Sequence, residues 1–270
     1  MTLNDPWIAA LAALFLWWFS TGAILVVVRL ADRRGRAARL GAALLSLPLL
    51  GLGVWGYLVT LESTGPAAAY HGFLAALAIW GWIELAFLTG VITGPNLRAC
   101  PEPLPEWERF MRAWGTVAYH EMALLGALVA MALVGWDAAN GYGLWTFLVL
   151  YVARVSAKLN LYLGVPRINT EFIPLALAHL PSHFRMRRMN VLYPVSIVGL
   201  GVAVMWFVGL LLRATQAGDV VGLALLAAIT ALALVEHLLM VVPLPDAKLW
   251  RWMLPAPKRS KGKVERTHGF

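Results

Sequence analysis

Long apolar stretches alternate with short polar connections along nearly the whole chain. Seven stretches reach the roughly 20 residues that an α-helix needs to cross a bilayer; they cover residues 7–30, 40–61, 70–93, 116–136, 141–163, 192–213 and 219–242. The pattern predicts an all-α, polytopic membrane protein with about seven transmembrane helices. We expect one transmembrane domain over residues 1–247 and a basic cytoplasmic tail over residues 248–270, because no connection is long enough to form a separate soluble domain.

The positive charges are distributed unevenly over the connections. Arg and Lys concentrate after the first, third and fifth stretches and in the tail, whereas the second, fourth and sixth connections carry neither. Connections rich in Lys and Arg stay on the cytoplasmic side of a membrane. The alternation therefore predicts that the N-terminus lies outside and the C-terminus inside, and an odd number of spans agrees with this.

Composition narrows the class further. Hydrophobic residues make up 60% of the 270 residues, and the mean hydropathy is +0.72, well above the values of soluble domains. The net charge of +8 resides in short connections and the tail, so we expect membrane lipid and not nucleic acid as a partner. Cys100 is the single cysteine, which excludes a disulfide framework and a thiolate metal cluster.

Ionisable residues interrupt several apolar stretches at a similar depth. The predicted topology places all of them in the cytoplasmic half of the membrane: Glu84, His120, Glu121, Arg154, Lys158, Glu236 and His237. Arg154 and Lys158 are four residues apart and share one helix face. A charge in hydrocarbon costs a few kcal/mol or more, so we expect these groups to face partners, a cavity or a ligand.

Two interpretations of these residues remain open. They form either a structural ion-pair network that joins four helices, or a polar cavity that holds a ligand, a pigment or a metal. Glu and His are common iron and zinc ligands, but His120-Glu121 does not continue as HExxH, and Pro181 separates His179 from His183. His120 is the candidate axial ligand of a chlorophyll magnesium, with a hydrogen-bonded core histidine as the alternative.

The two long connections, residues 90–102 and 163–190, mix apolar residues with Pro, Asn and Arg. Their prolines rule out a simple span, so we expect interfacial or re-entrant segments that cap the polar residues. Arg167 and Glu171 in VPRINTEF are candidate ligand or docking contacts. The alternative is a capped turn, with Asn169 or Thr170 as N-cap and Glu171 in the first helical turn.

At these residues the chain is similar to a known family. The segments FLTGVITGPNLRACPE, WGTVAYHE, LNLYLGVPRINTEFIP, HLPSHF and MNVLYPVS resemble the photosynthetic complex assembly protein 2 family, PuhE, of anoxygenic phototrophic bacteria. The resemblance covers essentially the whole chain. It implies a multi-pass protein of the bacterial inner or intracytoplasmic membrane that helps to assemble the reaction centre and core antenna, or controls the bacteriochlorophyll supplied to them.

The resemblance implies no catalytic residues, and it makes reaction-centre subunits, core antenna subunits or other assembly factors the expected partners. Our first hypothesis is a non-catalytic assembly factor. In it, Arg154, Lys158 and Arg167 pair with carboxylates of bacteriochlorophyll or a precursor, and His120 ligates magnesium. The alternatives are a metal-dependent membrane enzyme of pigment metabolism, which would use the same residues, and a tetrapyrrole transporter.

Overall fold

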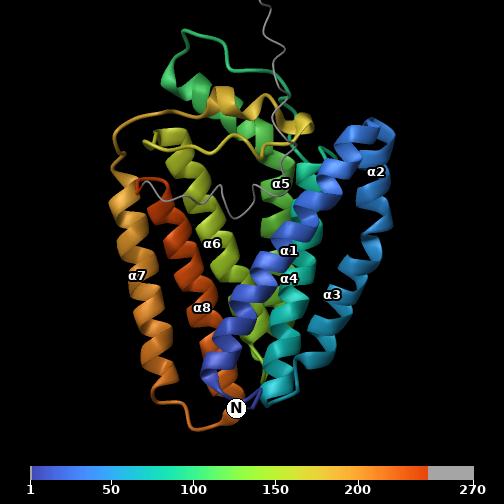
Figure 1. Ribbon diagram of the computed structural model, residues 1–270, viewed down its shortest axis with the longest axis vertical. Coiled ribbons are helices and arrows are strands. Elements are labelled where there is room, and N and C mark those ends of the chain that lie inside the picture. Colours follow the sequence, from blue (N-terminus) through green and yellow to red (C-terminus); the bar gives the residue numbers. More distant parts are fainter. Residues whose placement is uncertain (1, 243–270) are drawn as a thin grey trace, which may run out of the picture.

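The computed structural model describes residues 2–242, so the predicted basic tail over residues 248–270 lies outside the described residues. Figure 1 shows an all-helical bundle. Its α-helices are α1 (Pro6–Arg34), α2 (Arg36–Leu45), α3 (Leu47–Thr60), α4 (Pro66–Leu88), α5 (Glu106–Gly135), α6 (Tyr142–Leu163), α7 (Leu192–Leu211) and α8 (Ala217–Leu239). The described part also contains two short 3₁₀ helices, η1 (Leu175–Leu177) and η2 (Leu180–His183).

Within residues 2–242, seven helical segments are long and apolar enough to cross a membrane, when α2 and α3 are counted as one segment, Arg36–Thr60. This confirms the prediction of an all-α protein with about seven helices able to span a membrane. The reason is physical, because hydrocarbon offers no partner for backbone N–H and C=O groups, and a helix satisfies its own.

Several helix ends differ from the boundaries drawn on hydropathy. The second segment is divided at Ser46, because Pro48 lies in the first turn of α3, lacks an N–H donor and disfavours a continuous helix. Helix α4 ends at Leu88, where Gly90 takes a positive φ of 78°. Helix α5 begins at Glu106 and not near residue 116, because its charged first turns remain helical outside the apolar run.

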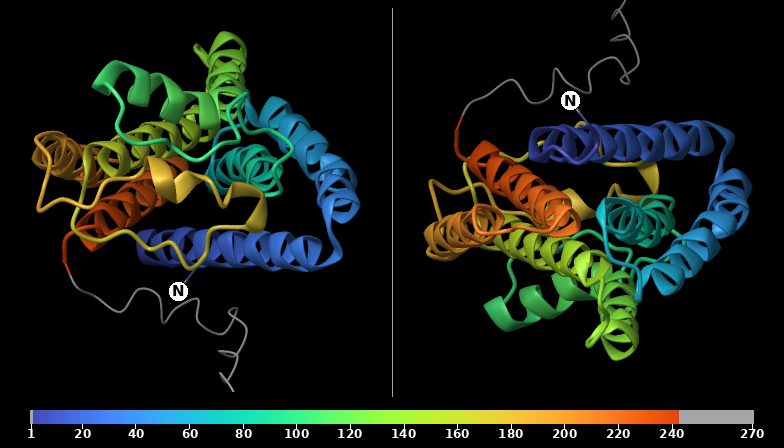
Figure 2. Two further views of the ribbon diagram at one scale, coloured as in Figure 1. Left: turned by 90° about the horizontal axis from the view of Figure 1, so that it is seen from above. Right: turned by 90° about the horizontal axis from the view of Figure 1, so that it is seen from below.

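Helix α4 occupies the centre of the bundle. The view from below in Figure 2 shows it surrounded by α1, α3, α5, α6 and α8. Of the 18 most apolar consecutive residues of α4, 61% are buried within the protein, whereas 11% of the corresponding stretch of α7 are buried. Polar side chains on α4 therefore face protein, whereas α7 presents most of its surface to the surroundings.

The two ends of the bundle are built differently. At one end, which we call the short-turn end, lie the N-terminus and the connections 61–65, 136–141 and 212–216. At the other, which we call the loop end, lie the long connections 89–105 and 164–191, drawn at the top of Figure 1.

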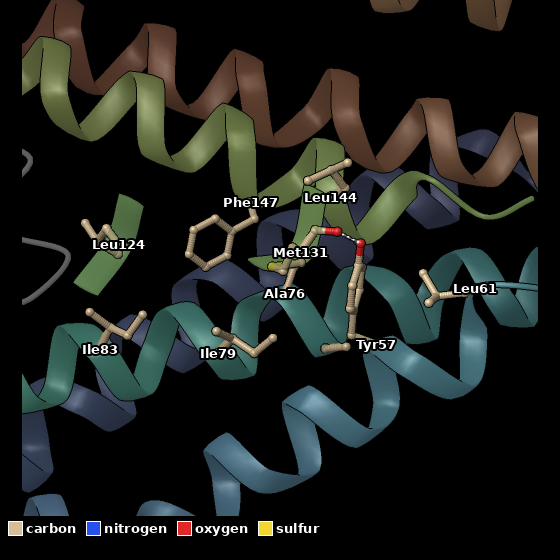
Figure 3. Packing of buried hydrophobic residues seen from close by; sticks show 10 residues of the cluster. Tyr57, Leu61, Ala76, Ile79, Ile83, Leu124, Met131, Leu144 and Phe147 are labelled. Atoms are coloured by element: carbon tan, nitrogen blue, oxygen red, sulfur yellow. Dashed lines mark hydrogen bonds between the residues drawn. The ribbon is translucent and has the colours of Figure 1, made fainter. Parts of the chain in front are cut away.

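Buried apolar side chains from α3, α4, α5 and α6 form a core in the middle of the bundle (Figure 3). Phe147 packs edge-on against Trp80, with ring centroids 5.3 Å apart. Tyr57 crosses this core and donates a hydrogen bond of 2.7 Å to the carbonyl of Met131. A Cβ on Gly135 would overlap the Tyr57 hydroxyl oxygen, so position 135 needs a residue without a side chain.

At the loop end, residues 93–96 lie directly against the backbone of α5. The His120 N–H donates to Thr93 O at 3.0 Å, and the Asn96 N–H donates to Gly115 O at 3.0 Å. A Cβ on Gly94 would overlap Gly115 and Thr116. Beside it, Leu177 and Leu180 of the second long connection pack on Phe87 of α4, as part of one buried cluster. Both long connections therefore cover the loop end of α4 and α5.

Candidate functional site

Glu84 is the centre of a polar cluster near the loop end. Helix α4 positions its carboxylate so that Oε2 accepts a hydrogen bond of 2.8 Å from Arg154 Nη2 on α6. Its Oε1 lies 3.7 Å from His120 Nε2 on α5. Side-chain exposure is 9% for Glu84 and 0% for His120. One carboxylate thus connects three helices inside the bundle.

A second ion pair lies one turn along α6, between Lys158 and Glu121 of α5. The Lys158 ammonium also lies 5.3 Å from the centroid of the Phe87 ring. The same ring contacts the imidazole of His120, with centroids 4.3 Å apart. Phe87 is therefore the apolar neighbour of both the histidine and the lysine.

Glu236 completes the polar cluster from α8. It lies within electrostatic range of Arg154 and Glu84, it is exposed, and no hydrogen bond or ion pair engages it within residues 2–242. The polar cluster thus contains three carboxylates (Glu84, Glu121, Glu236) against the two cations Arg154 and Lys158. With these five groups ionised and His120 neutral, the polar cluster would carry one surplus negative charge.

Several buried atoms of the polar cluster keep unused hydrogen-bonding capacity. Among the described residues, Glu84 Oε1, both ring nitrogens of His120 and Arg154 Nε make no hydrogen bond. A buried polar group left in this state costs about 1–3 kcal/mol. The hydrogen-bonding capacity of the polar cluster is therefore not fully used within the described residues.

His237 does not join the polar cluster, although it follows Glu236 in the chain. Its Nε2 lies 2.9 Å from Ser156 Oγ and its Nδ1 lies 2.8 Å from Ala233 O. Ser156 Oγ lies 2.9 Å from Ser196 Oγ, which accepts a bond of 3.0 Å from Asn160 Nδ2. Both nitrogens of His237 are satisfied, and we interpret this second network as hydrogen bonding that holds α6, α7 and α8 together.

Arg167 and Glu171 also lie apart from the polar cluster. Both are exposed in the connection after α6. The backbone N–H of Arg167 donates to Met240 O at 3.1 Å, and that of Glu171 donates to Asn169 Oδ1 at 3.1 Å. Asn169 therefore caps a turn, but no helix begins there, since the next helical residue is Leu175.

The geometry gives little support to metal or pigment ligation. Within the described part of the chain, no three His, Cys, Asp or Glu side chains gather closely enough to hold a metal ion. His183 uses Nε2 at 3.1 Å from Arg98 O, away from the polar cluster. The ring of His120 is fully enclosed between Phe87 and Glu84, so it has no open face on which a flat tetrapyrrole could place its magnesium.

Sequence reasoning missed the contacts of Phe87, Ser156 and Ser196. Phe87 is three residues after Glu84 and so shares its helix face. Ser156 and Asn160 are also four residues apart, on the opposite side of α6 from Arg154 and Lys158. This spacing is a signal that α6 has two polar faces, and it is readable from the chain alone.

Comparison with known proteins gives a match over nearly the whole chain. A protein of Rhodobacter capsulatus described as "Uncharacterized 30.4 kDa protein in puhA 5'region" is 51% identical over 257 residues, which cover 94% of this chain and 93% of that protein. No solved structure matches. Residues 3–261 match the family described as "Protein of unknown function (DUF3623)", and the chain belongs to this family.

Proposed function

We propose that this protein is a non-catalytic, membrane-integral factor in the assembly of the photosynthetic reaction centre and its core antenna. The gene setting of the relative, in the puhA 5′ region, supports a role in photosynthesis. The neighbouring gene, puhA, has the same puh prefix as the PuhE family that the sequence resembles. Seven span-length helices fit a multi-pass protein of the bacterial inner or intracytoplasmic membrane.

The structural observation that carries the proposal is the exposed carboxylate of Glu236. An unpaired charge near hydrocarbon is costly and usually faces a partner or a cavity. Glu84 and Glu121 already have cationic partners, whereas Glu236 has no ion pair among the described residues and lies within electrostatic range of Arg154, which attracts it, and of Glu84, which repels it. A partner helix that brings a Lys, an Arg or another hydrogen-bond donor to Glu236 would neutralise the surplus charge of the polar cluster.

We assign the polar cluster to protein contact and not to pigment ligation. His120 is enclosed, and two of the three cations expected to pair with pigment carboxylates, Arg154 and Lys158, are held by Glu84 and Glu121, while Arg167 lies apart. A transmembrane subunit, in contrast, needs only one accessible group at the right depth. Glu236 is that group.

The test uses a phototrophic host that lacks this gene, complemented with the wild-type gene, Glu236→Gln or Glu171→Gln. Glu171→Gln is the matched control, because it removes an exposed carboxylate outside the polar cluster. The readout is the near-infrared absorbance of reaction centre and core antenna per milligram of membrane protein. We expect wild type and Glu171→Gln to restore both complexes, and Glu236→Gln to restore them in part, at equal levels of the protein.

Two results would contradict the proposal at different levels. Normal amounts of both complexes in the deletion strain would exclude a role in their assembly. Full restoration by Glu236→Gln would leave the assembly role intact but remove Glu236 as the contact site.

A further inference from the structure

A second charged group lies at the loop end, apart from the polar cluster. We call it the arginine site. It combines the first turns of α5, the last turn of α6 and the chain after η2, through the residues Glu106, Arg109, Tyr162, Arg185 and Arg187. None of these residues takes part in the proposed contact with a partner helix, so the two proposals are independent.

Arg109 is the unusual member of the arginine site. Only 8% of the residue is exposed. Its Nη2 donates to His183 O at 2.9 Å, and its guanidinium lies 4.8 Å from the centroid of the Tyr162 ring. Its buried Nη1 has no hydrogen-bond partner, and no carboxylate within residues 2–242 lies within ion-pair distance of it. Buried charges are normally paired, so we expect an anion to pair with Arg109.

The charges around Arg109 are unbalanced in the same direction. Glu106 forms an ion pair with Arg185 and is within electrostatic range of Arg109 and Arg187 as well. Three guanidinium groups thus share one carboxylate, which leaves two surplus positive charges. Burial lowers the pKa of nearby His183; a hydrogen bond to Arg98 O opposes this, and the positive charges of Arg109 and Arg112 lower the pKa further. The positive charge of Arg109 therefore acts on His183 as well as on Glu106.

The arginines are held by ordered backbone. Val165 N donates to Arg185 O at 3.2 Å, and Arg187 N donates to Val165 O at 3.2 Å. A Cβ on Gly164 would lie 2.9 Å from Arg187 Cγ, so the stem of Arg187 packs on the chain where α6 ends. Arg185 lies 5.9 Å from the centroid of the Tyr162 ring. Less conformational entropy is lost when such preordered groups bind a ligand.

Aromatic side chains adjoin the arginine site on the same turns of α5. Trp107 is 71% exposed and contacts Phe110, and Phe110 packs edge-on against Tyr162 with ring centroids 5.7 Å apart. Trp114 is exposed one to two turns further along. Exposed Trp beside the end of an apolar span is typical of the lipid headgroup level. The arginine site therefore lies where a membrane presents phosphate groups.

We propose that the arginine site binds the phosphate of an anionic phospholipid headgroup. Arg109, Arg185 and Arg187 donate to the phosphate oxygens, because a guanidinium matches the planar, multiple-acceptor geometry of a phosphate group. Trp107 and Phe110 lie against the glycerol and upper acyl region. Inorganic phosphate shares the headgroup chemistry but lacks the apolar contacts.

The test measures thermal unfolding of the full-length protein in detergent as short-chain lipid is added. The probes are phosphatidylglycerol, phosphatidylcholine and inorganic phosphate. Arg187→Gln is the main variant, because Arg187 is exposed and its loss is compatible with folding. Arg213→Gln is the matched control, which removes an exposed charge at the short-turn end.

We expect phosphatidylglycerol to raise the unfolding temperature and phosphatidylcholine to have little effect. Arg187→Gln should weaken the apparent affinity for phosphatidylglycerol roughly fivefold, and Arg213→Gln should not. Equal stabilisation by both lipids, or unchanged affinity in Arg187→Gln, would overturn the proposal. Equal stabilisation by inorganic phosphate and phosphatidylglycerol at the same concentration would overturn the assignment to lipid.

Discussion

Glu84 shows how much depends on a single residue in this bundle. Its carboxylate contacts Arg154 at 2.8 Å and faces His120 at 3.7 Å. Breaking a fully buried ion pair costs about 3–5 kcal/mol, because it leaves one charge without a partner. The Arg154 side chain is 36% exposed, so this ion pair is not fully buried. We therefore expect a smaller loss, of about 1–3 kcal/mol.

A double-mutant cycle tests this coupling. Glu84→Gln should lower the free energy of unfolding in detergent by about 1–3 kcal/mol. The double variant with Arg154→Gln should lose less than the sum of the two single losses, since it leaves neither charge unpaired. The control is Glu108→Gln at the Glu108–Arg112 pair, whose side chains are 45% and 39% exposed; it should cost less than about 1 kcal/mol. Strictly additive losses at Glu84 and Arg154 would show that the two do not interact.

At the scale of elements, hydropathy predicts the helices and not their ends. The seven spans follow from the chain, because lipid permits few other backbone structures. The division at Ser46 depends on one proline, and the start of α5 at Glu106 depends on polar turns that lie outside the apolar run. A hydropathy window averages over both features.

The composition of the candidate site was predictable in part for a related reason. Spacing of four residues puts Arg154 and Lys158 on one face of α6, and both find carboxylates there. Which carboxylate each one meets depends on the rotation and tilt of α4 and α5, which the sequence does not give. The rotation of α8 about its axis likewise decides that His237 faces Ser156 while its neighbour Glu236 lies near Arg154 and Glu84.

Gly94 lies where a loop segment and a helix leave no room for a side chain. The segment 93–96 lies so close to α5 that a Cβ on Gly94 would overlap the backbone at Gly115. Backbone cannot move aside as a side chain can, so Gly94→Ala should lower the free energy of unfolding by about 1–3 kcal/mol. Gly51→Ala is the control, since Gly51 lies inside α3 with nothing within 4 Å of its added Cβ. It should be neutral or slightly stabilising in a thermal unfolding assay, and an equally neutral Gly94→Ala would show that the segment is free to move off α5.

At the scale of the whole molecule, the two ends of the bundle predict its orientation in the membrane. The loop end carries the arginine-rich connection 164–191 and the arginines at the junction of α1 and α2, whereas the three connections of the short-turn end carry a single arginine, Arg213. Because positive connections stay in the cytoplasm, the loop end should be cytoplasmic and the N-terminus periplasmic. Cys100 makes this measurable, since it is the single cysteine and lies partly exposed in the connection 89–105.

A membrane-impermeant maleimide should therefore leave Cys100 unmodified in sealed, right-side-out spheroplasts and modify it in inverted vesicles. Moving the thiol to the short-turn end, with Cys100→Ser and Ser63→Cys in one chain, should reverse the pattern, because Ser63 is exposed there. Cys100→Ser alone gives the background. Rapid modification of Cys100 in sealed spheroplasts would place the loop end outside, and with it the arginine site and the Glu236 end of the polar cluster. The charge rule would then fail for this protein, and the partner that meets Glu236 would have to approach from the periplasmic half of the membrane.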